Sequence, residues 1–163
     1  MAVDMFMNMG TNIKGETQDD AQKPKNDIDV LAWSWGMSQS GTTHTGGGGG
    51  AGKVNIQDLS FTKYIDSATP AIQIHCALGK HIPKCVLLVR KAGDKQQKYI
   101  EITLETVIVS SVSTGGSGGE DRLTENVSLN FAKVSFEYFT QDDKGTTKSA
   151  GAFKYDIAAN KQQ

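Results

Sequence analysis

The sequence predicts a mainly β protein, an antiparallel β-barrel or sandwich with one packed α-helix. Along much of the chain, apolar and polar residues alternate with the period of a half-buried strand. Glycine-rich and polar turns separate these segments, and start and stop signals for a convincing helix occur once, between residues 66 and 79. At 163 residues the chain is large enough to bury a core of its own. We therefore expect a single domain over residues 1–163.

The first part of the chain reads as short strands joined by polar loops. Residues 4–9 alternate and then turn, and residues 13–16 are expected to return beside them. Residues 17–26 are polar and aperiodic, which is typical of a surface loop. Residues 28–37 form the next expected strand, with these large apolar residues on one face: Leu31, Trp33, Trp35 and Met37.

The expected helix begins after residues 66–70, whose sequence Asp-Ser-Ala-Thr-Pro offers a capping hydroxyl and a proline at the first helical position. It should cover residues 70–78 and end at Gly79. The residues expected on one stripe of this helix are Ala71, Ile74, His75 and Leu78.

The other expected strands cover residues 54–61, 84–91, 99–110, 122–140 and 151–157. In the fourth of these, the apolar face shifts near Phe131 and Ala132, which indicates a bulge or a bend between two sheets. The last residues, 160–163, are expected to fray.

A glycine-rich segment at about residues 39–53 forms an extended loop between two expected strands. From Gly47 to Lys53 it satisfies the spacing of a phosphate-binding loop, G-x-x-x-x-G-K. The next residue is Val54 rather than serine or threonine, and it opens a strand pattern rather than a helix, so the sequence argues against nucleotide binding. The segment is either a flexible crossing or an arm that becomes ordered against a neighbouring subunit.

Charge and hydropathy narrow the classes of partner. The 17 basic and 18 acidic side chains nearly cancel, so no net field favours nucleic acid or an anionic membrane. The N-terminal residues lack the basic and apolar regions of a signal peptide, and no apolar run approaches the ~20 residues of a spanning helix. We expect synthesis in the cytoplasm, with any export by a route that removes no signal peptide.

The candidate chemical residues give no catalytic or metal constellation. Cys76 and Cys85 lie near His75 and His81, which leaves core packing, a disulfide and a zinc site open, and the spacing favours core packing. We expect no catalytic residue, no cofactor and no metal. Two tryptophans two residues apart, Trp33 and Trp35, favour a core or subunit interface, with a carbohydrate-binding β-sandwich as the alternative function.

Several sequence blocks together resemble the Hcp family, the haemolysin-coregulated proteins of bacterial type VI secretion. They occur in the family's order and span nearly the whole chain. The blocks are IKGE at 13–16, NDIDVLAWSWG at 26–36, GAGKV at 50–54, QDLSFTKY at 57–64, GKHI at 79–82, RKAG at 90–93 and TENVSLNF at 124–131.

The resemblance implies a β-barrel subunit with a helix at its side, similar to phage tail tube proteins. It implies six subunits in a ring, rings stacked into a tube, a contractile sheath that expels the tube, a spike protein at its tip and effector cargo in its lumen. The protein would then be secreted to the medium or to a target cell, and it would not be an enzyme. We expect contacts between subunits or rings at Gly46, Gly47, Gly48, Gly49, Gly50, Gly52, Lys53, Trp33 and Trp35.

Overall fold

The computed structural model describes residues 2–41, 51–93 and 96–163 of the chain. Within them, the strands form one eight-stranded antiparallel sheet and one two-stranded sheet. The strands are β1 (Val3–Asn8), β2 (Ile28–Ser34), β3 (Met37–Gly41), β4 (Ala51–Ile56), β5 (Leu59–Tyr64), β6 (Ile82–Lys91), β7 (Gln97–Thr114), β8 (Thr124–Gln141), β9 (Thr147–Asp156) and β10 (Lys161–Gln162). The helices are the 3-10 helix η1 (Lys23–Lys25) and the α-helix α1 (Thr69–Leu78).

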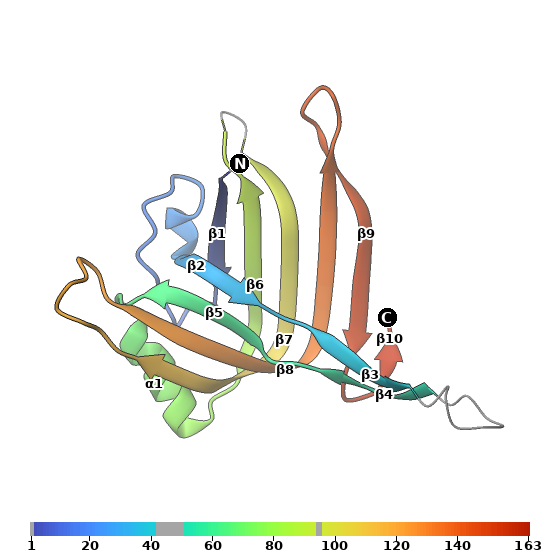
Figure 1. Cartoon of the computed structure of the whole chain (residues 1–163), viewed down its shortest axis with the longest axis horizontal. Coiled ribbons are helices and arrows are strands. Elements are labelled where there is room, and N and C mark those ends of the chain that lie inside the picture. The colour runs from blue at the N-terminus through green and yellow to red at the C-terminus, as the bar shows by residue number, and fades with distance from the viewer. Residues whose placement is uncertain (1, 42–50, 94–95) are drawn as a thin grey trace.

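The two longest strands, β7 and β8, close the large sheet into a barrel. The strand order is β10-β9-β8-β5-β2-β1-β6-β7, and β7 pairs again with β8 to close the ring of strands. The N-terminal half of β8 pairs with β5, as in Leu59 opposite Leu129, whereas its C-terminal half pairs with β9, as in Val134 opposite Tyr155. Strands β9 and β10 therefore extend the wall beyond the closed barrel (Figure 1).

The core follows from strand alternation. Along β8, the buried residues Val127, Leu129 and Phe131 alternate with exposed or half-buried ones. The next buried residue is Val134, three positions on, so the predicted shift of the apolar face near residue 131 is confirmed. The mainly β fold with a packed helix is likewise confirmed.

Helix α1 lies against the barrel at one end and packs on β7 (Figure 1). It begins with Pro70 in its first turn and ends at Gly79, whose positive φ of 62° suits glycine. The expected side-chain cap of the helix N-terminus is wrong, because the N-cap is Ala68. Among the described residues, no helix combines the length and the apolar character that crossing a membrane would require.

The expected helix stripe is only partly right. His75 is buried and Ala71 packs against the core, but Ile74 and Leu78 are 51% and 69% exposed. The helix instead buries Ile72. The apolar residues of this helix exceed what one face can bury, so hydrophobicity alone did not identify the packed side.

Three expected strand boundaries are wrong for local reasons. Residues 13–16 form no strand, because the segment makes single contacts such as Gly15 N–H to the Asn26 carbonyl oxygen at 2.8 Å instead of a ladder. The expected strand 28–37 ends at Ser34, and the expected strand 54–61 is divided between β4 and β5. Residues 160–163 do not simply fray, since β10 pairs with β9 there.

The face assigned to residues 28–37 is only partly right, because Trp33 and Trp35 pack against the core but Leu31 and Met37 do not. A register shift between Val30 and Ala32 reverses the side-chain alternation within β2. Val30 is buried and Leu31 is 39% exposed, whereas Met37, 42% exposed, already belongs to β3. The interruption of one residue places Val30 and Trp33 on the core side together, although strict alternation would separate them.

Candidate functional site: the arm, its root and the faces of the barrel

Strands β3 and β4 form an arm that leaves the barrel. Met37 pairs with Ile56 and Gln39 with Val54, and within the described residues these two strands pair only with each other. The arm extends past the end of the wall formed by β9 and β10 (Figure 1). A two-stranded ribbon of this kind is marginally stable alone in water, so an external contact would stabilise it.

The predicted contact residues divide into three groups. Gly46, Gly47, Gly48, Gly49 and Gly50 lie outside the described residues, so their expected role stays a prediction. Gly52 and Lys53 are exposed on β4, in the arm itself. At Gly52 a Cβ atom would lie 2.4 Å from Ser40 Oγ across the hairpin, so glycine permits the close approach of the two strands.

The two tryptophans are half-buried against the core rather than displayed together on a surface. Trp33 lies on β2, opposite Phe61 of β5. Trp35 follows β2 and stacks on Phe136, with ring centroids 6.2 Å apart and ring planes 19° apart. Both side chains therefore pack against the core of the chain, and their expected part in a subunit or ring contact stays a prediction.

Part of one face of the barrel, formed by β2, β5 and β8, is lined by hydroxyl and amide side chains. The Ser60 and Ser128 hydroxyls share a hydrogen bond of 2.9 Å, and Thr62 Oγ1 donates to Asn126 Oδ1 at 2.6 Å. A shallow hollow of about 200 Å³ lies on this face. Its lining is Ala32, Trp33, Ser34, Ser60, Phe61, Thr62 and Asn126.

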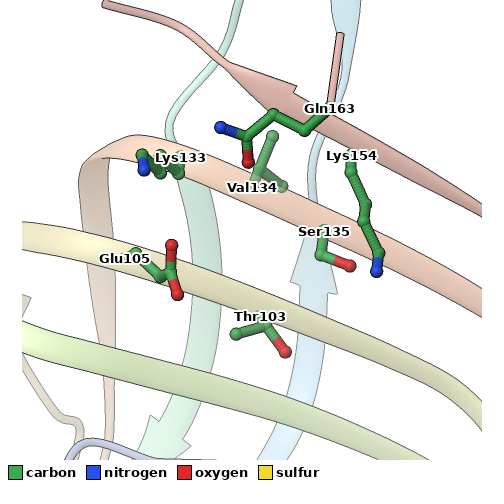
Figure 2. Close-up of a pocket in the computed structure, with 7 residues that line it drawn as sticks. All are labelled: Thr103, Glu105, Lys133, Val134, Ser135, Lys154 and Gln163. Carbon is green, nitrogen blue, oxygen red and sulfur yellow. The ribbon is translucent and has the colours of Figure 1, made fainter.

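A second hollow, of about 260 Å³, lies on β7, β8 and β9 near the C-terminal residue (Figure 2). Its charged lining residues are Glu105, Lys133 and Lys154, and Lys133 Nζ lies 3.9 Å from Asp156 Oδ2. The opposite charges partly offset one another, so the hollow presents no concentrated field for a charged ligand.

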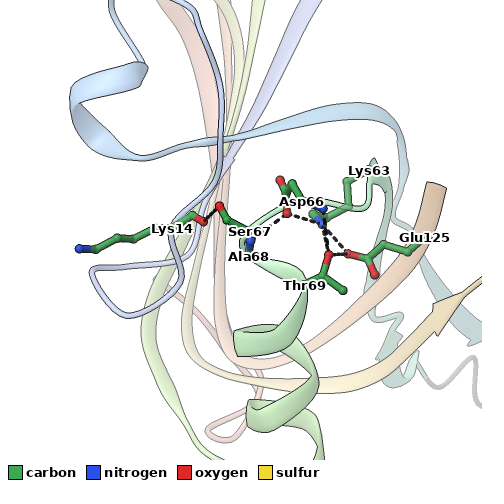
Figure 3. Close-up of polar contacts among 7 residues, drawn as sticks. All are labelled: Lys14, Lys63, Asp66, Ser67, Ala68, Thr69 and Glu125. Atoms are coloured by element: carbon green, nitrogen blue, oxygen red, sulfur yellow. Dashed lines mark hydrogen bonds and ion pairs between the residues drawn. The ribbon is translucent and has the colours of Figure 1, made fainter. Parts of the chain in front are cut away.

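The start of α1 is tied to the barrel by a buried polar cluster that sequence reasoning missed (Figure 3). Lys63 of β5 and Glu125 of β8 are both fully buried and form an ion pair. Lys63 Nζ also lies 2.9 Å from Asp66 Oδ1, and Thr69 Oγ1 donates to Glu125 Oε1 at 2.7 Å. Ser67 Oγ donates to the Lys14 carbonyl oxygen at 3.0 Å, which joins the preceding loop to the same corner. The only sequence signal was a lysine and a glutamate at inward-facing strand positions.

A second buried cation holds the loop before β2. Arg90 of β6 is 4% exposed and donates to Asp19 Oδ2 at 2.6 Å. The hydrogen bond from Arg90 is the largest influence lowering the pKa of Asp19 below its ordinary value. Burial raises the pKa of Asp27 at the end of this loop, although Asn8 Nδ2 donates to its carboxylate. These residues fix the loop against the barrel.

The cysteines and histidines do not converge on a described site. Cys85 is buried and Cys76 half-buried, and both are free thiols, as the core-packing interpretation predicted. The Nδ1 atom of His75 lies 2.8 Å from the Ala71 carbonyl oxygen of its own helix, and His81 shares only a hollow of about 270 Å³ with it. Among the described residues, no group of three or more His, Cys, Asp or Glu side chains could hold a metal ion.

Comparison with known proteins gives consistent matches over nearly the whole chain. Residues 6–138 match the family model described as type VI secretion system effector, Hcp. Protein hcp1 of Pseudomonas aeruginosa strain PAO1 is 62% identical over 156 residues, which cover 95% of this chain and 94% of that protein.

Solved structures agree with that match. A structure described as a type six secretion system protein has a TM-score of 0.91 at 27% identity and covers 99% of this chain and 100% of its own. Hcp1 from Salmonella typhimurium has a TM-score of 0.79 at 40% identity, with both chains fully covered. An Hcp3 protein from Pseudomonas aeruginosa shares the fold at a TM-score of 0.62 and 16% identity.

Proposed function

From the premise that this chain belongs to the Hcp family of type VI secretion proteins, we propose that its copies close into hexameric rings that stack into a hollow tube. The chain is a tube and effector-carrier protein of type VI secretion, as its family and its structural relatives indicate. The observation that carries the assembly proposal is the β3–β4 arm, a ribbon that extends from the barrel and pairs with no other described strand. A neighbouring copy would supply the missing contact.

The residues of the arm define the proposed contact. Ser38, Gln39 and Ser40 of β3 and Lys53 of β4 are exposed, so the arm reaches a neighbour with short polar groups and one cation. We propose that Gly46 to Gly50, together with Gly52 and Lys53, lie against the next subunit or ring. Such contacts are individually weak, which suits a tube that assembles in one cell and comes apart later.

The face of β2, β5 and β8 that carries these hydroxyl and amide side chains is the proposed wall of the tube lumen. Its hydroxyl and amide side chains bond to one another across the strands, as in the pairs Ser60–Ser128 and Thr62–Asn126. A wall of this kind holds neither acidic nor basic cargo by long-range attraction, so different effector proteins could pass along it. The spike at the tube tip and the contractile sheath around it are further proposed partners.

Carbohydrate binding is not supported by the comparisons or by the site. The ring of Trp35 is already stacked on Phe136, with Phe153 beside it, so its packing partners are aromatic side chains of the barrel wall. The family role is structural, and we assign no reaction to this chain.

Assembly is tested first by mass. The purified protein should elute as a closed ring of six times the 17.5 kDa subunit mass, and higher concentration should give stacked rings. A stable single copy at high protein concentration and physiological salt would contradict the proposal.

The arm is tested by deleting the five residues Gly46 to Gly50. We expect intact rings with fewer and shorter tubes by electron microscopy, and less protein in the medium of a sheath-competent cell. The secreted wild-type protein should have the same mass as the cytoplasmic protein, because the proposed route removes no signal peptide. Unchanged tube length and secretion in the deletion variant would show that the glycine run makes no stacking contact.

A further inference from the structure

The root of the arm is the place where two chain segments leave the barrel side by side. The outgoing segment crosses at Trp35 and Gly36, and the returning one crosses at Gln57 and Asp58. Gln57 N–H donates to the Gly36 carbonyl oxygen at 3.0 Å, and a Cβ atom at Gly36 would lie 3.2 Å from Gln57 Oε1. The two segments are thus closely joined, but one hydrogen bond would still let the ribbon swivel about this point.

Trp35 anchors the outgoing segment to the extension of the barrel wall. Its ring lies 6.2 Å from Phe136 of β8 and 6.4 Å from Phe153 of β9, and Phe153 is stacked in turn on Tyr155 at 5.9 Å. The indole Nε1 atom is buried and has no hydrogen-bond partner among the described residues. Aromatic packing, rather than a polar contact, therefore holds this side chain in place.

Asp58 anchors the returning segment to different strands. Ser110 Oγ of β7 donates to Asp58 Oδ2 at 2.7 Å, and Asn130 Nδ2 of β8 donates to Asp58 Oδ1 at 2.9 Å. Both carboxylate oxygens are used, so the carboxylate is fixed in orientation as well as position. The root is thereby held on two sides, by an aromatic stack on one and a pair of charge-assisted hydrogen bonds on the other.

We propose that Trp35 and Asp58 are positioning residues, which fix the direction of the β3–β4 arm before any neighbour binds. Neither residue belongs to β3 or β4, and each acts through the strand that follows or precedes it. An arm held in one direction loses little conformational entropy on docking, whereas a swivelling arm would lose more and would bind more weakly. The inference rests on the proposed role of the arm in stacking, but the anchoring can be measured without it.

The test measures arm motion in free rings and stacking separately. A nitroxide label is placed on the exposed arm residue by Asn55→Cys in a Cys76→Ser background, where buried Cys85 stays unlabelled. Electron paramagnetic resonance then reports the mobility of the label, native mass reports the ring, and microscopy reports tubes. The root variants are Trp35→Leu, Trp35→Phe and Asp58→Ala, with Tyr138→Leu as the control for loss of an exposed aromatic ring from β8.

We expect Trp35→Leu and Asp58→Ala to keep the ring mass, to increase the mobile fraction of the label, and to reduce tube formation at least tenfold. Trp35→Phe should restore much of the immobile label fraction and of tube formation. Tyr138→Leu should change neither of them. An immobile label in both root variants would overturn the proposal. If Trp35→Leu no longer assembles into the oligomeric ring, Asp58→Ala alone decides the test. The two hydrogen bonds that Asp58→Ala removes are exposed, so this variant should still fold and assemble. A mobile arm with normal tubes would leave the anchoring intact and refute the role of the arm in stacking.

Discussion

Replacing Lys63 by methionine tests the buried cluster that joins α1 to the barrel. Lys63 has no exposed surface, and its ammonium faces the carboxylates of Glu125 and Asp66. Methionine is close to the lysine stem in volume, so the change removes the charge with little change in packing. The variant would leave two buried carboxylates close to each other without their cation.

The expected cost follows from the distances. At an effective dielectric constant of about 20, unit charges 2.9 Å apart, as in the Lys63–Asp66 contact, attract by roughly 6 kcal/mol. Part of this attraction only offsets the desolvation of the ions, and single truncations of buried pairs typically cost about 3–5 kcal/mol. We expect Lys63→Met to lower the free energy of unfolding by that amount.

The double variant Lys63→Met/Glu125→Leu separates the ion pair from the packing. It removes both fully buried charges, while Asp66 keeps the Ala68 N–H as a donor at 2.9 Å. Because apolar replacements of a buried pair are often neutral, the double variant should be at least about 2 kcal/mol more stable than Lys63→Met alone.

Guanidinium unfolding followed by tryptophan fluorescence measures these differences. All variants are compared at one protomer concentration and with ring mass checked, because assembly adds to apparent stability. Lys98→Met is the control, since its ion pair with Glu101 is half-exposed and should contribute less than about 1 kcal/mol. The single variant Glu125→Leu completes the comparison. If Lys63→Met costs no more than Lys98→Met, or if the costs of Lys63→Met and Glu125→Leu simply add in the double variant, the cluster does not act as a coupled unit.

Three further predictions concern single residues: Gly15, Asp27 and Cys85. Gly15→Ala should cost about 1–3 kcal/mol in chemical unfolding, because its Cβ would lie 2.3 Å from the Asp27 carbonyl oxygen, whereas Gly118→Ala, with open space around it, should cost almost nothing. Burial raises the pKa of Asp27, so its ionisation opposes folding at neutral pH. Asp27→Asn should therefore raise the denaturation midpoint at pH 7. This gain should vanish as the pH falls through the raised pKa of the folded protein towards the ordinary aspartate value of 3.8. A lower midpoint at pH 7 would show that the hydrogen bond from Asn8 needs the charge. Burial raises the pKa of Cys85 to about 12, so a maleimide at pH 8 should label this thiol only after unfolding, as peptide mass mapping would show.

The alternation of the sequence predicted the strands that make the barrel wall, because each has one face in the core. It failed where the chain changes sheets. The sequence of residues 31–37 alternates without a break past Ser34, yet β2 ends there and β3 belongs to a different sheet. A period of two residues says nothing about which partner strand accepts the hydrogen bonds, so it cannot detect such a change. The register shift after Val30 likewise leaves no sign in the sequence pattern.

The buried charges were beyond sequence reasoning for a different reason. Lys63 and Glu125 are cross-strand partners, so they face the same side of the sheet, and that side is the core. Charged residues at such positions usually indicate a solvated face. Only the three-dimensional pairing of β5 with β8, together with the start of α1 beside them, shows that Lys63 and Glu125 form a buried ion pair.

The role of Trp35 at the root of the arm cannot be established by one assay, because the residue affects both stability and assembly. Its half-buried ring packs on Phe136 and Phe153, so a substitution would lower the stability measured in an unfolding experiment. The strand that follows it is exposed, so the same substitution should also weaken assembly. If lost stability alone explained the defect, Lys63→Met, which destabilises the other end of the barrel, would reduce tube formation as much as Trp35→Leu. We expect it to reduce tube formation far less at temperatures where both rings remain folded, because the anchors of the arm are untouched.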